Sequence, residues 1–245
     1  MDASLYHKFY EVEDRHWWFA GRRAIVAGEL ARRLPRGAPE RRILDVGCGT
    51  GGMLPILAPH GRVSGIDMEP LALDYCRRRG FADVALQQGY VPAQPLDVIT
   101  LFDVLEHVPD EPGFLRLLSG WLKPGGLIVI TVPAFPWLWS RHDDLNHHQR
   151  RYRRGQLVGA LTGNGFRVER ASYFNFLLFP VVVATRLLER APKPGTTAEE
   201  EVLKHLTIGR LNGALTRLFG AERHLLGVGD LPWGVSLLAV ARKPE

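Results

Sequence analysis

The chain has 245 residues, with 31 Lys or Arg against 26 Asp or Glu and a formal net charge of +5 at pH 7. This length suits one α/β domain with additions and is enough to bury a substantial core. The basic surplus is modest and contains no block of Lys or Arg, so the charge does not indicate a nucleic-acid tail.

The cysteine content and the apolar stretches of the chain indicate its cellular compartment. Cys48 and Cys76 form neither a disulfide framework nor a metal-ligand spacing, which is typical of a reducing compartment. The longest apolar stretch, Phe176–Ala184, is far too short to span a bilayer, and the N-terminal residues have no apolar signal core. We therefore expect a cytoplasmic protein without a transmembrane segment.

The N-terminal segment is rich in aromatic and charged residues, and we expect a helix that begins at about Arg22 and is closed by Pro35. The aromatic cluster Trp17-Trp18-Phe19 has two interpretations. As a lid, Trp17 and Trp18 close over the active site and contact the substrate. Alternatively, they pack this helix onto a sheet.

A glycine-rich turn follows the first expected strand. Residues 43–46 have the apolar character of a buried strand, three glycines follow within five residues, and residues 53–57 can continue as a helix. Glycines at such a turn let the backbone approach a ligand, and the N–H groups of the next helix point at the same place. The stretch therefore predicts a site for a nucleotide-like cofactor.

The spacing of these glycines has two interpretations. Gly47, Gly49 and Gly52 match the GxGxxG of dinucleotide enzymes, with Asp67 placed 20 residues after Gly47. However, Asp45 stands two residues before the first glycine, so that the run is also Asp-x-Gly-x-Gly-x-Gly.

The second pattern resembles motif I of the class I S-adenosylmethionine (SAM)-dependent methyltransferases. In that family the acidic residue helps to hold the cationic methionine end of SAM, and the glycines lie against the cofactor. The resemblance implies a SAM site that includes the residues Asp45, Gly47, Cys48, Gly49 and Gly51.

The second strand is expected over Val63–Asp67 and ends in a carboxylate. Asp67 is well placed to accept hydrogen bonds from a ribose diol, and it also suits the N-cap of a helix over Pro70–Arg79. Met68 follows it. After a short third strand, Gly89 and Tyr90 stand where many methyltransferases carry a Gly-Asp that recognises adenine. The aspartate is absent here, so only Gly89 is assigned to the cofactor site.

The fourth strand, Leu96–Phe102, runs into Asp103-Val-Leu-Glu-His107. This segment resembles motif IV of small-molecule methyltransferases, including the quinone O-methyltransferases, where the residues after the strand border the methyl group. The resemblance adds Phe102 and Asp103 to the cofactor site. Nucleic-acid amino-methyltransferases have an Asn/Asp-Pro-Pro-aromatic turn at this point, and its absence argues against a nucleic-acid partner.

A helix over Phe114–Leu122 and a fifth strand over Leu127–Val132 lead to a loop crowded with titratable groups. Its histidines and aspartates are His142, Asp143, Asp144, His147 and His148. The loop has three interpretations, namely a substrate-facing loop, a solvated polar loop or a metal site. Because no known metal spacing occurs, we expect no metal. The expected substrate contacts are His147, Arg151 and Tyr152.

A hydroxyl acceptor must lose its proton as the methyl group arrives, and histidine is the side chain that titrates closest to neutral pH. His148 and His107 are the two candidate bases, both in loops that follow parallel strands. His148 is preferred because the neighbouring cations of Arg150 and Arg151 should lower its pKa and keep it neutral. His107 matches the Glu-His pair of the family, a region that helps to hold a divalent cation in some quinone O-methyltransferases.

A helix over Gln156–Thr162 and strands over Phe166–Tyr173 and Gly234–Arg242 complete the expected order, with an insertion over residues 174–233. The insertion contains an apolar stretch, a linker over residues 191–197 and a helix over residues 202–219. The apolar face of that helix is formed by Ile208, Leu211, Leu215 and Leu218. We expect it to pack on the sheet, with a membrane contact or a substrate-covering role as alternatives.

The resemblance implies a Rossmann-like, doubly wound α/β fold with a seven-stranded, mostly parallel sheet and an antiparallel last strand. We expect a single domain with an N-terminal helical cap (1–40), a SAM-binding core (41–173), the insertion (174–233) and the last strand (234–242). The expected activity is transfer of a methyl group from SAM, leaving S-adenosylhomocysteine, to a small hydroxylated acceptor of apolar or lipid-like character. A SAM-binding protein without catalysis and a nicotinamide-dependent oxidoreductase are the alternatives.

Overall fold

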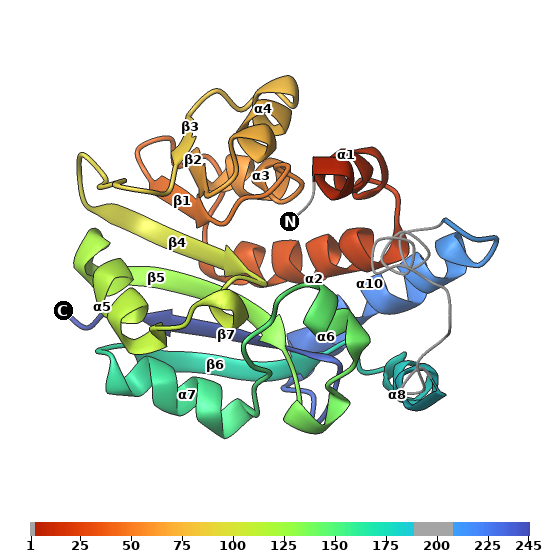
Figure 1. The fold of residues 1–245 in the computed structure, drawn as a ribbon. Coiled ribbons are helices and arrows are strands. Elements are labelled where there is room, and N and C mark those ends of the chain that lie inside the picture. Colours follow the sequence, from red (N-terminus) through yellow and green to blue (C-terminus); the bar gives the residue numbers. More distant parts are fainter. Residues whose placement is uncertain (1–2, 189–207) are drawn as a thin grey trace.

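The structure, a computed structural model, describes residues 3–188 and 208–245. Its centre is a seven-stranded sheet in the order β3-β2-β1-β4-β5-β7-β6 (Figure 1). The strands are β1 (Arg42–Val46), β2 (Arg62–Asp67), β3 (Val84–Leu86), β4 (Leu96–Phe102), β5 (Leu122–Pro133), β6 (Arg167–Phe174) and β7 (Ser236–Arg242). The helices are α1 (Ala3–Val12), α2 (Trp17–Arg33), α3 (Leu54–Leu57), α4 (Pro70–Arg78), α5 (Glu111–Trp121), α6 (Arg141–Leu145), α7 (Arg154–Gly163), α8 (Phe179–Leu188) and α10 (Asn212–Val228), with short 3-10 turns η1 (Ala58–His60), η2 (Leu105–His107) and η3 (Pro136–Leu138).

The pairing of the strands confirms the predicted fold class. β1 lies between β2 and β4 and is parallel to both, whereas β7 is antiparallel to β5 and β6. Two apolar clusters cover the two faces of the sheet: α5 and α7 contribute to one, and α2, α3, α4 and α10 contribute to the other. Because both faces are covered, the central strands are nearly continuous apolar runs.

Two elements, α2 and β5, begin five residues before their predicted starts. α2 begins at Trp17 and not at Arg22, since the ring of His16 caps the helix by accepting the Trp18 N–H at 3.3 Å. β5 begins at Leu122, so the Lys-Pro-Gly-Gly segment forms the start of the strand instead of separating it from α5. The aromatic pair therefore belongs to the first turn of α2.

The insertion differs more strongly from its prediction. The predicted linker, residues 191–197, lies outside the described residues, as does the first part of the helix predicted over 202–219. α10 begins only at Asn212 and continues to Val228. The helix packs on the sheet as expected, but of its predicted face only Leu215 contacts the core, since Ile208, Leu211 and Leu218 are exposed. Phe219 and Leu226 are buried instead. The apolar residues of this helix cover more than one face, so the pattern alone did not identify the buried one.

Phe219 joins α10 to α2 and to the sheet. Its ring is fully buried, with its centroid 5.5 Å from that of Trp18 and 6.2 Å from that of Phe174. Gly21 permits this approach, since a Cβ atom there would lie 2.2 Å from Cδ1 of Phe219. Phe219 therefore packs the N-terminal helix and the insertion together on the sheet.

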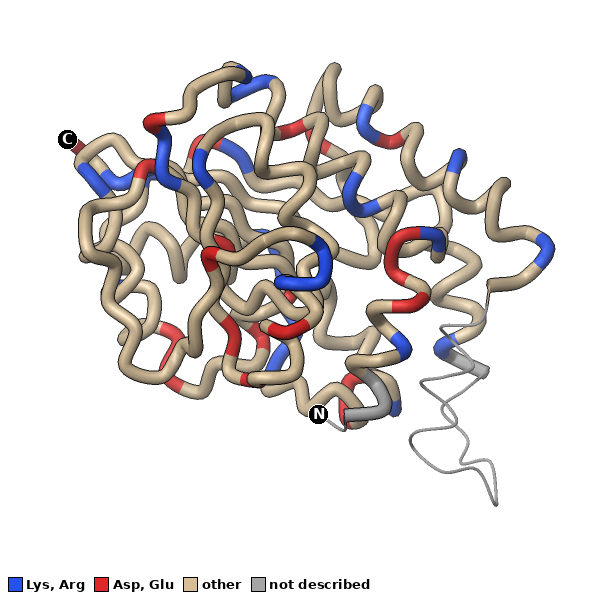
Figure 2. Tube along the Cα trace, turned by 90° about the horizontal axis from the view of Figure 1, so that it is seen from above, with Lys and Arg blue, Asp and Glu red and all other residues tan. Residues whose placement is uncertain are grey.

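Charged side chains are distributed over the molecule. Viewed from above, basic and acidic positions alternate along the trace and do not gather into one basic face (Figure 2). Among the described residues, no helix combines the length and the apolar character that crossing a bilayer requires.

Replacing Phe219 with alanine should lower the free energy of unfolding by about 3–5 kcal/mol, because a buried aromatic ring is lost and a cavity remains. Leu218→Ala is the matched control, since the neighbouring side chain is exposed and its loss should cost less than about 1 kcal/mol. Urea unfolding followed by circular dichroism measures both values. Equal losses would contradict this packing.

Candidate active site

The glycine turn after β1 opens toward free space. Gly47, Gly49 and Gly51 have φ values of +70°, +53° and +85°, a region that favours glycine. A Cβ atom at Gly49 would meet nothing within 4 Å, whereas one at Gly52 would lie 2.3 Å from Oε2 of Glu13. The three glycines of the Asp-x-Gly-x-Gly-x-Gly pattern share the unusual backbone conformation, which favours the methyltransferase interpretation.

Asp67 lies at the end of β2, beside this turn. Its carboxylate accepts the N–H of Gly49 at 2.8 Å and that of Glu69 at 3.0 Å. Burial raises its pKa, while these backbone donors act in the opposite direction. The alternative role is not observed, because Glu69 and not Asp67 is the N-cap residue of α4. Each carboxylate oxygen can accept a second hydrogen bond, as a ribose diol requires.

Asp45 lies at the end of β1 and is almost fully buried. Burial raises its pKa to about 7, although a hydrogen bond from Thr100 Oγ1 at 2.6 Å and the charge of Arg22 favour the ionised form. A cationic ligand at this position would favour the carboxylate further. The side chain is therefore poised between its neutral and charged forms near physiological pH.

Arg22, which the sequence analysis did not select, stands between the ends of β1 and β4. It comes from α2 and forms an ion pair with Asp103, whose other carboxylate oxygen accepts a hydrogen bond from Thr131 Oγ1 at 3.0 Å. The Nε atom of Arg22 is buried and has no hydrogen-bond partner among the described residues. A buried donor without a partner costs free energy, and an anionic ligand group would satisfy it.

The N-terminal segment lies against the glycine turn. Glu13 accepts a hydrogen bond from the Thr50 hydroxyl and forms an ion pair with Arg79 at 2.8 Å. Burial raises the pKa of Tyr6 on α1, and the negative charges of Asp67 and Glu69 add to this effect, so the phenol lies near the cofactor turn. The segment that carries Glu13 and Tyr6 therefore borders the candidate cofactor site.

Trp17 and Trp18 were predicted to contact the substrate. Both pack against Phe219, with ring centroids 5.9 and 5.5 Å away. This arrangement corresponds to the packing alternative of the sequence analysis. Their contact with a substrate stays a prediction.

A second group of titratable side chains lies after β4 and β5. Nδ1 of His148 is 2.9 Å from a carboxylate oxygen of Asp143, which is fully buried and also accepts a hydrogen bond from Arg151 at 2.9 Å. Burial alone would raise the pKa of Asp143, but the hydrogen bond from His148 and the positive charge of Arg151 hold it well below its usual value. Because the carboxylate accepts the Nδ1 proton, the neutral imidazole has its free lone pair on Nε2.

Nε2 of His148 points toward Glu106, whose Oε1 atom is 4.0 Å away. Both oxygens of Glu106 are buried and lack a hydrogen-bond partner among the described residues. Burial, followed by the nearby charge of Asp103, raises the pKa of this carboxyl well above its usual value. Burial and the charge of Asp103 therefore both favour the protonated form of Glu106.

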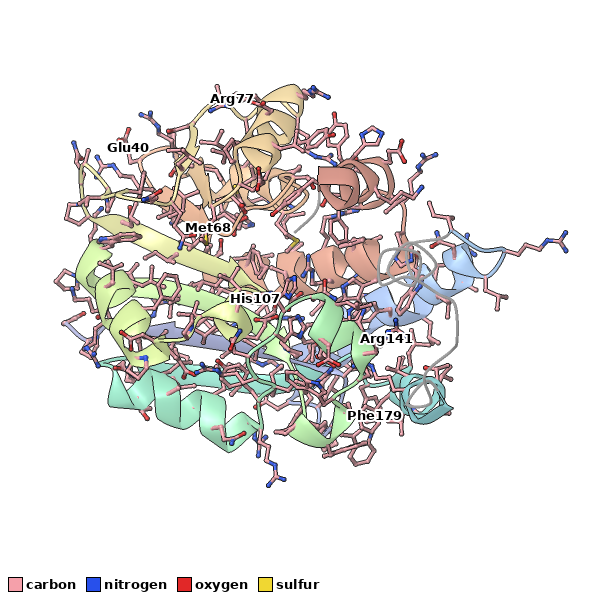
Figure 3. The ribbon with its side chains drawn as sticks, viewed as in Figure 1. Glu40, Met68, Arg77, His107, Arg141 and Phe179 are labelled. Atoms are coloured by element: carbon pink, nitrogen blue, oxygen red, sulfur yellow. The ribbon has the colours of Figure 1, made fainter. Side chains whose placement is uncertain are left out.

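His107 completes this group, with its ring centroid 4.8 Å from that of His148 in an edge-to-face arrangement. Figure 3 shows it between the end of β4 and α6. Burial lowers the pKa of His107, and the neighbouring His148 adds to this shift. Ligand atoms of Glu106, His107 and His148 lie within 4.8 Å of one another, a spacing that could hold a metal ion. The expectation that no metal takes part stays a prediction.

The remaining predicted site residues lie in varied surroundings. Arg151 and Tyr152 are buried: Arg151 donates to the carbonyl of Ala134 at 2.8 Å, and the Tyr152 hydroxyl donates to Glu111 at 3.0 Å. His147 is exposed with a φ of +55°. Contact of these side chains with a substrate stays a prediction.

The other predicted cofactor residues also differ in exposure. Met68 is 79% exposed after β2, whereas Phe102 is buried at the end of β4. Cys48 is buried with its Sγ atom 3.8 Å from that of Cys76, and Gly89 has a φ of +73° with open space at its Cβ position. Their contact with a cofactor stays a prediction.

Comparison with known proteins gives a consistent result. A family described as a methyltransferase domain matches residues 18–171. Ubiquinone biosynthesis O-methyltransferase of Bordetella avium is 36% identical over 149 residues, covering 54% of this chain and 61% of that protein. Trans-aconitate 2-methyltransferase of Methylobacterium nodulans is 34% identical over 122 residues, covering 47% and 46%. The chain thus spans less than two thirds of the length of these relatives.

Solved structures share the fold. A chain from the complex between the Haloferax volcanii Trm112 methyltransferase activator and a methyltransferase matches with a TM-score of 0.61 at 18% identity, covering 99% of this chain and 95% of that one. Geranyl diphosphate C-methyltransferase from Streptomyces coelicolor gives 0.56 at 16% identity, with coverages of 89% and 78%.

Arg22→Ala should weaken binding of S-adenosylhomocysteine by about 1.5–3 kcal/mol, the usual contribution of a hydrogen bond to a charged group. Arg15→Ala provides the control, because that side chain is exposed. Titration calorimetry measures both affinities. An unchanged affinity in the Arg22 variant would show that the unpartnered Nε donor does not face the ligand.

The affinity for S-adenosylhomocysteine should fall as the pH drops below about 7, because Asp45 must then release a proton before it can pair with the amino group of the ligand. The decrease should approach tenfold for each pH unit, as one linked proton requires, between about pH 5 and 7. Calorimetry at several pH values tests this, with Asp45→Asn as the comparison. A profile with the same slope in both proteins would assign the proton to another group.

Proposed function

Because the chain belongs to the methyltransferase domain family, we propose that this SAM-dependent methyltransferase acts on a hydroxyl group of a small, apolar or lipid-like acceptor. When bound, SAM supplies an electrophilic methyl group. The observation that carries the proposal is the pairing of Asp143 with His148, whose ring lies against that of His107 just after β4.

The residues around the glycine turn fit the cofactor. Arg22 offers its unpartnered Nε donor to a carboxylate, and Asp45 offers a buried carboxyl to an amino group. Asp67 offers acceptor positions to a ribose diol, while Gly49 leaves the space above the turn open. These features match an α-amino acid joined to a nucleoside.

His148 removes the proton of the acceptor hydroxyl in this proposal. Asp143 holds the imidazole by Nδ1 and stabilises the positive charge that forms when Nε2 takes up a proton. The sequence analysis preferred His148 because the cations of Arg150 and Arg151 were expected to lower its pKa. In the structure these two cations are paired with Glu111 and Asp143, so that reason no longer applies. The support comes instead from the carboxylate behind the ring.

The character of the acceptor is inferred from aromatic side chains that follow β5 and β6. Phe135 stacks on Tyr173 with centroids 4.8 Å apart, and Phe179 on α8 lies 5.8 Å from Phe135 and 6.1 Å from Trp137. Such a cluster suits an apolar ring or chain. The resemblance to proteins named for ubiquinone biosynthesis supports the same inference.

The two alternative functions explain fewer of the observed features. A SAM-binding protein without catalysis would need the glycine turn, but it would not need a histidine held by a buried aspartate. A nicotinamide oxidoreductase gives no reason for the ion pair between Arg22 and Asp103.

His148→Ala should reduce turnover by roughly 10²–10⁴ while leaving the affinity for S-adenosylhomocysteine nearly unchanged. Asp143→Asn should also reduce turnover, because the imidazole loses the charge that stabilises its protonated form. The matched control is Asp144→Asn, an exposed carboxylate on the same helix. Steady-state assays with a catechol as the test acceptor supply the rates.

Full activity in the His148 variant would move the proton transfer to His107 or to no side chain at all. A chelator provides the second comparison, since activity lost on chelation and restored by a divalent cation would assign Glu106, His107 and His148 to a metal ion instead of a base.

A further inference from the structure

The outer face of α10 carries a continuous apolar seam. Its members recur alternately at three and four residues and are Leu211, Ala214, Leu218, Ala221, Leu225 and Val228. This spacing places them on one stripe of a helix. Leu211 is 69% exposed, Leu218 43%, Leu225 42% and Val228 93%. We call these six residues the α10 seam.

A basic stripe borders the seam. Arg210 and Arg217 each precede a seam leucine by one position, so they share the seven-residue spacing of the seam. Both are exposed. The one acidic residue of the helix, Glu222, is fully buried and accepts the N–H of Leu177 at 2.9 Å. Within the described residues, the exposed surface of α10 therefore carries no negative charge.

From this pattern we propose that the outer face of α10 binds an anionic lipid surface. The seam inserts at the boundary between headgroups and acyl chains, and the basic stripe contacts the phosphate groups. The helix lies in the plane of the interface, because α10 is attached to the protein along its opposite side through Phe219 and Leu226. The chain is thus held at the membrane surface without crossing it.

The position of α10 relates this surface to the candidate active site. The side chain of Asn212, in the first turn of α10, accepts the N–H of Trp17 and donates to the carbonyl of Arg15, both at 2.8 Å. α8 and the start of α10 lie at the end of the molecule toward which β4 points (Figure 1). A membrane bound along α10 would therefore lie near the end of the sheet that carries the site. The proposal itself does not depend on methyl transfer.

A second copy of the chain is the other occupant that such a seam can accept. In a pair of these helices, each seam would bring its own basic stripe to the interface, and no acidic residue of α10 is exposed to face it. Like charges along both sides of a helix pair are unfavourable. An anionic bilayer supplies the negative charge that the second copy lacks.

Co-sedimentation with vesicles tests the proposal on the full chain. Vesicles of phosphatidylcholine with about 30 mol% phosphatidylglycerol should bind the protein, pure phosphatidylcholine vesicles should bind it much less, and added salt should weaken the binding. The double variant Leu218→Ser/Leu225→Ser should lower the affinity at least about tenfold, since binding scales with buried apolar area. Arg217→Glu should lower it by a similar factor on anionic vesicles alone.

Leu117→Ser is the matched control, because this leucine is 49% exposed on α5, far along the chain from the seam. It should bind like the unchanged protein, and thermal unfolding should verify that all variants fold. No binding to anionic vesicles, or equal binding by the double variant, would overturn the proposal. A dimer in light scattering that the double variant abolishes would also overturn it in favour of a second copy.

Discussion

Two carboxyl groups at the ends of adjacent parallel strands set the main constraint on this protein. Asp45 is buried near the end of β1, whereas Asp103 directly follows β4 and is partly exposed. Arg22 from α2 supplies a cation to both, since it forms an ion pair with Asp103 and its charge favours the ionised form of Asp45. The N-terminal helix is therefore part of the site, and α10 in turn holds that helix through Phe219. Sheet, helix and insertion are coupled through these contacts.

The same strand ends bring together two kinds of chemistry. On one side, the glycine turn and Asp67 offer an open backbone surface with donors and acceptors for a nucleoside. On the other side, β4 leads into Glu106 and His107, and the loop after β5 returns to place His148 beside them. The buried carboxyl group of Glu106, next to a histidine held by Asp143, separates the proton chemistry from the charged cofactor end. This division follows from the strand order, in which β4 lies between β1 and β5.

Sequence reasoning succeeded where the signal was local. The strand, turn and carboxylate around Asp45 are contiguous, so periodicity and the glycine spacing located them, and the resemblance supplied the seven-stranded, mostly parallel sheet with its antiparallel last strand. It failed where the partner is remote: Arg22 meets Asp103 across 81 residues, and no local pattern marks it. The buried face of α10 also could not be predicted, because leucines cover its exposed seam as well, and the packed face depends on remote contacts such as that of Phe219 with Gly21.

Calorimetric titration with S-adenosylhomocysteine and, separately, with NADH tests whether the glycine turn with Asp45, Arg22 and Asp67 holds SAM. We expect S-adenosylhomocysteine to bind at one site and NADH not to bind. Gly49→Val should abolish binding because its side chain fills the open space above the turn. Binding of NADH in place of S-adenosylhomocysteine, or full affinity in a folded Gly49 variant, would contradict this role of the turn.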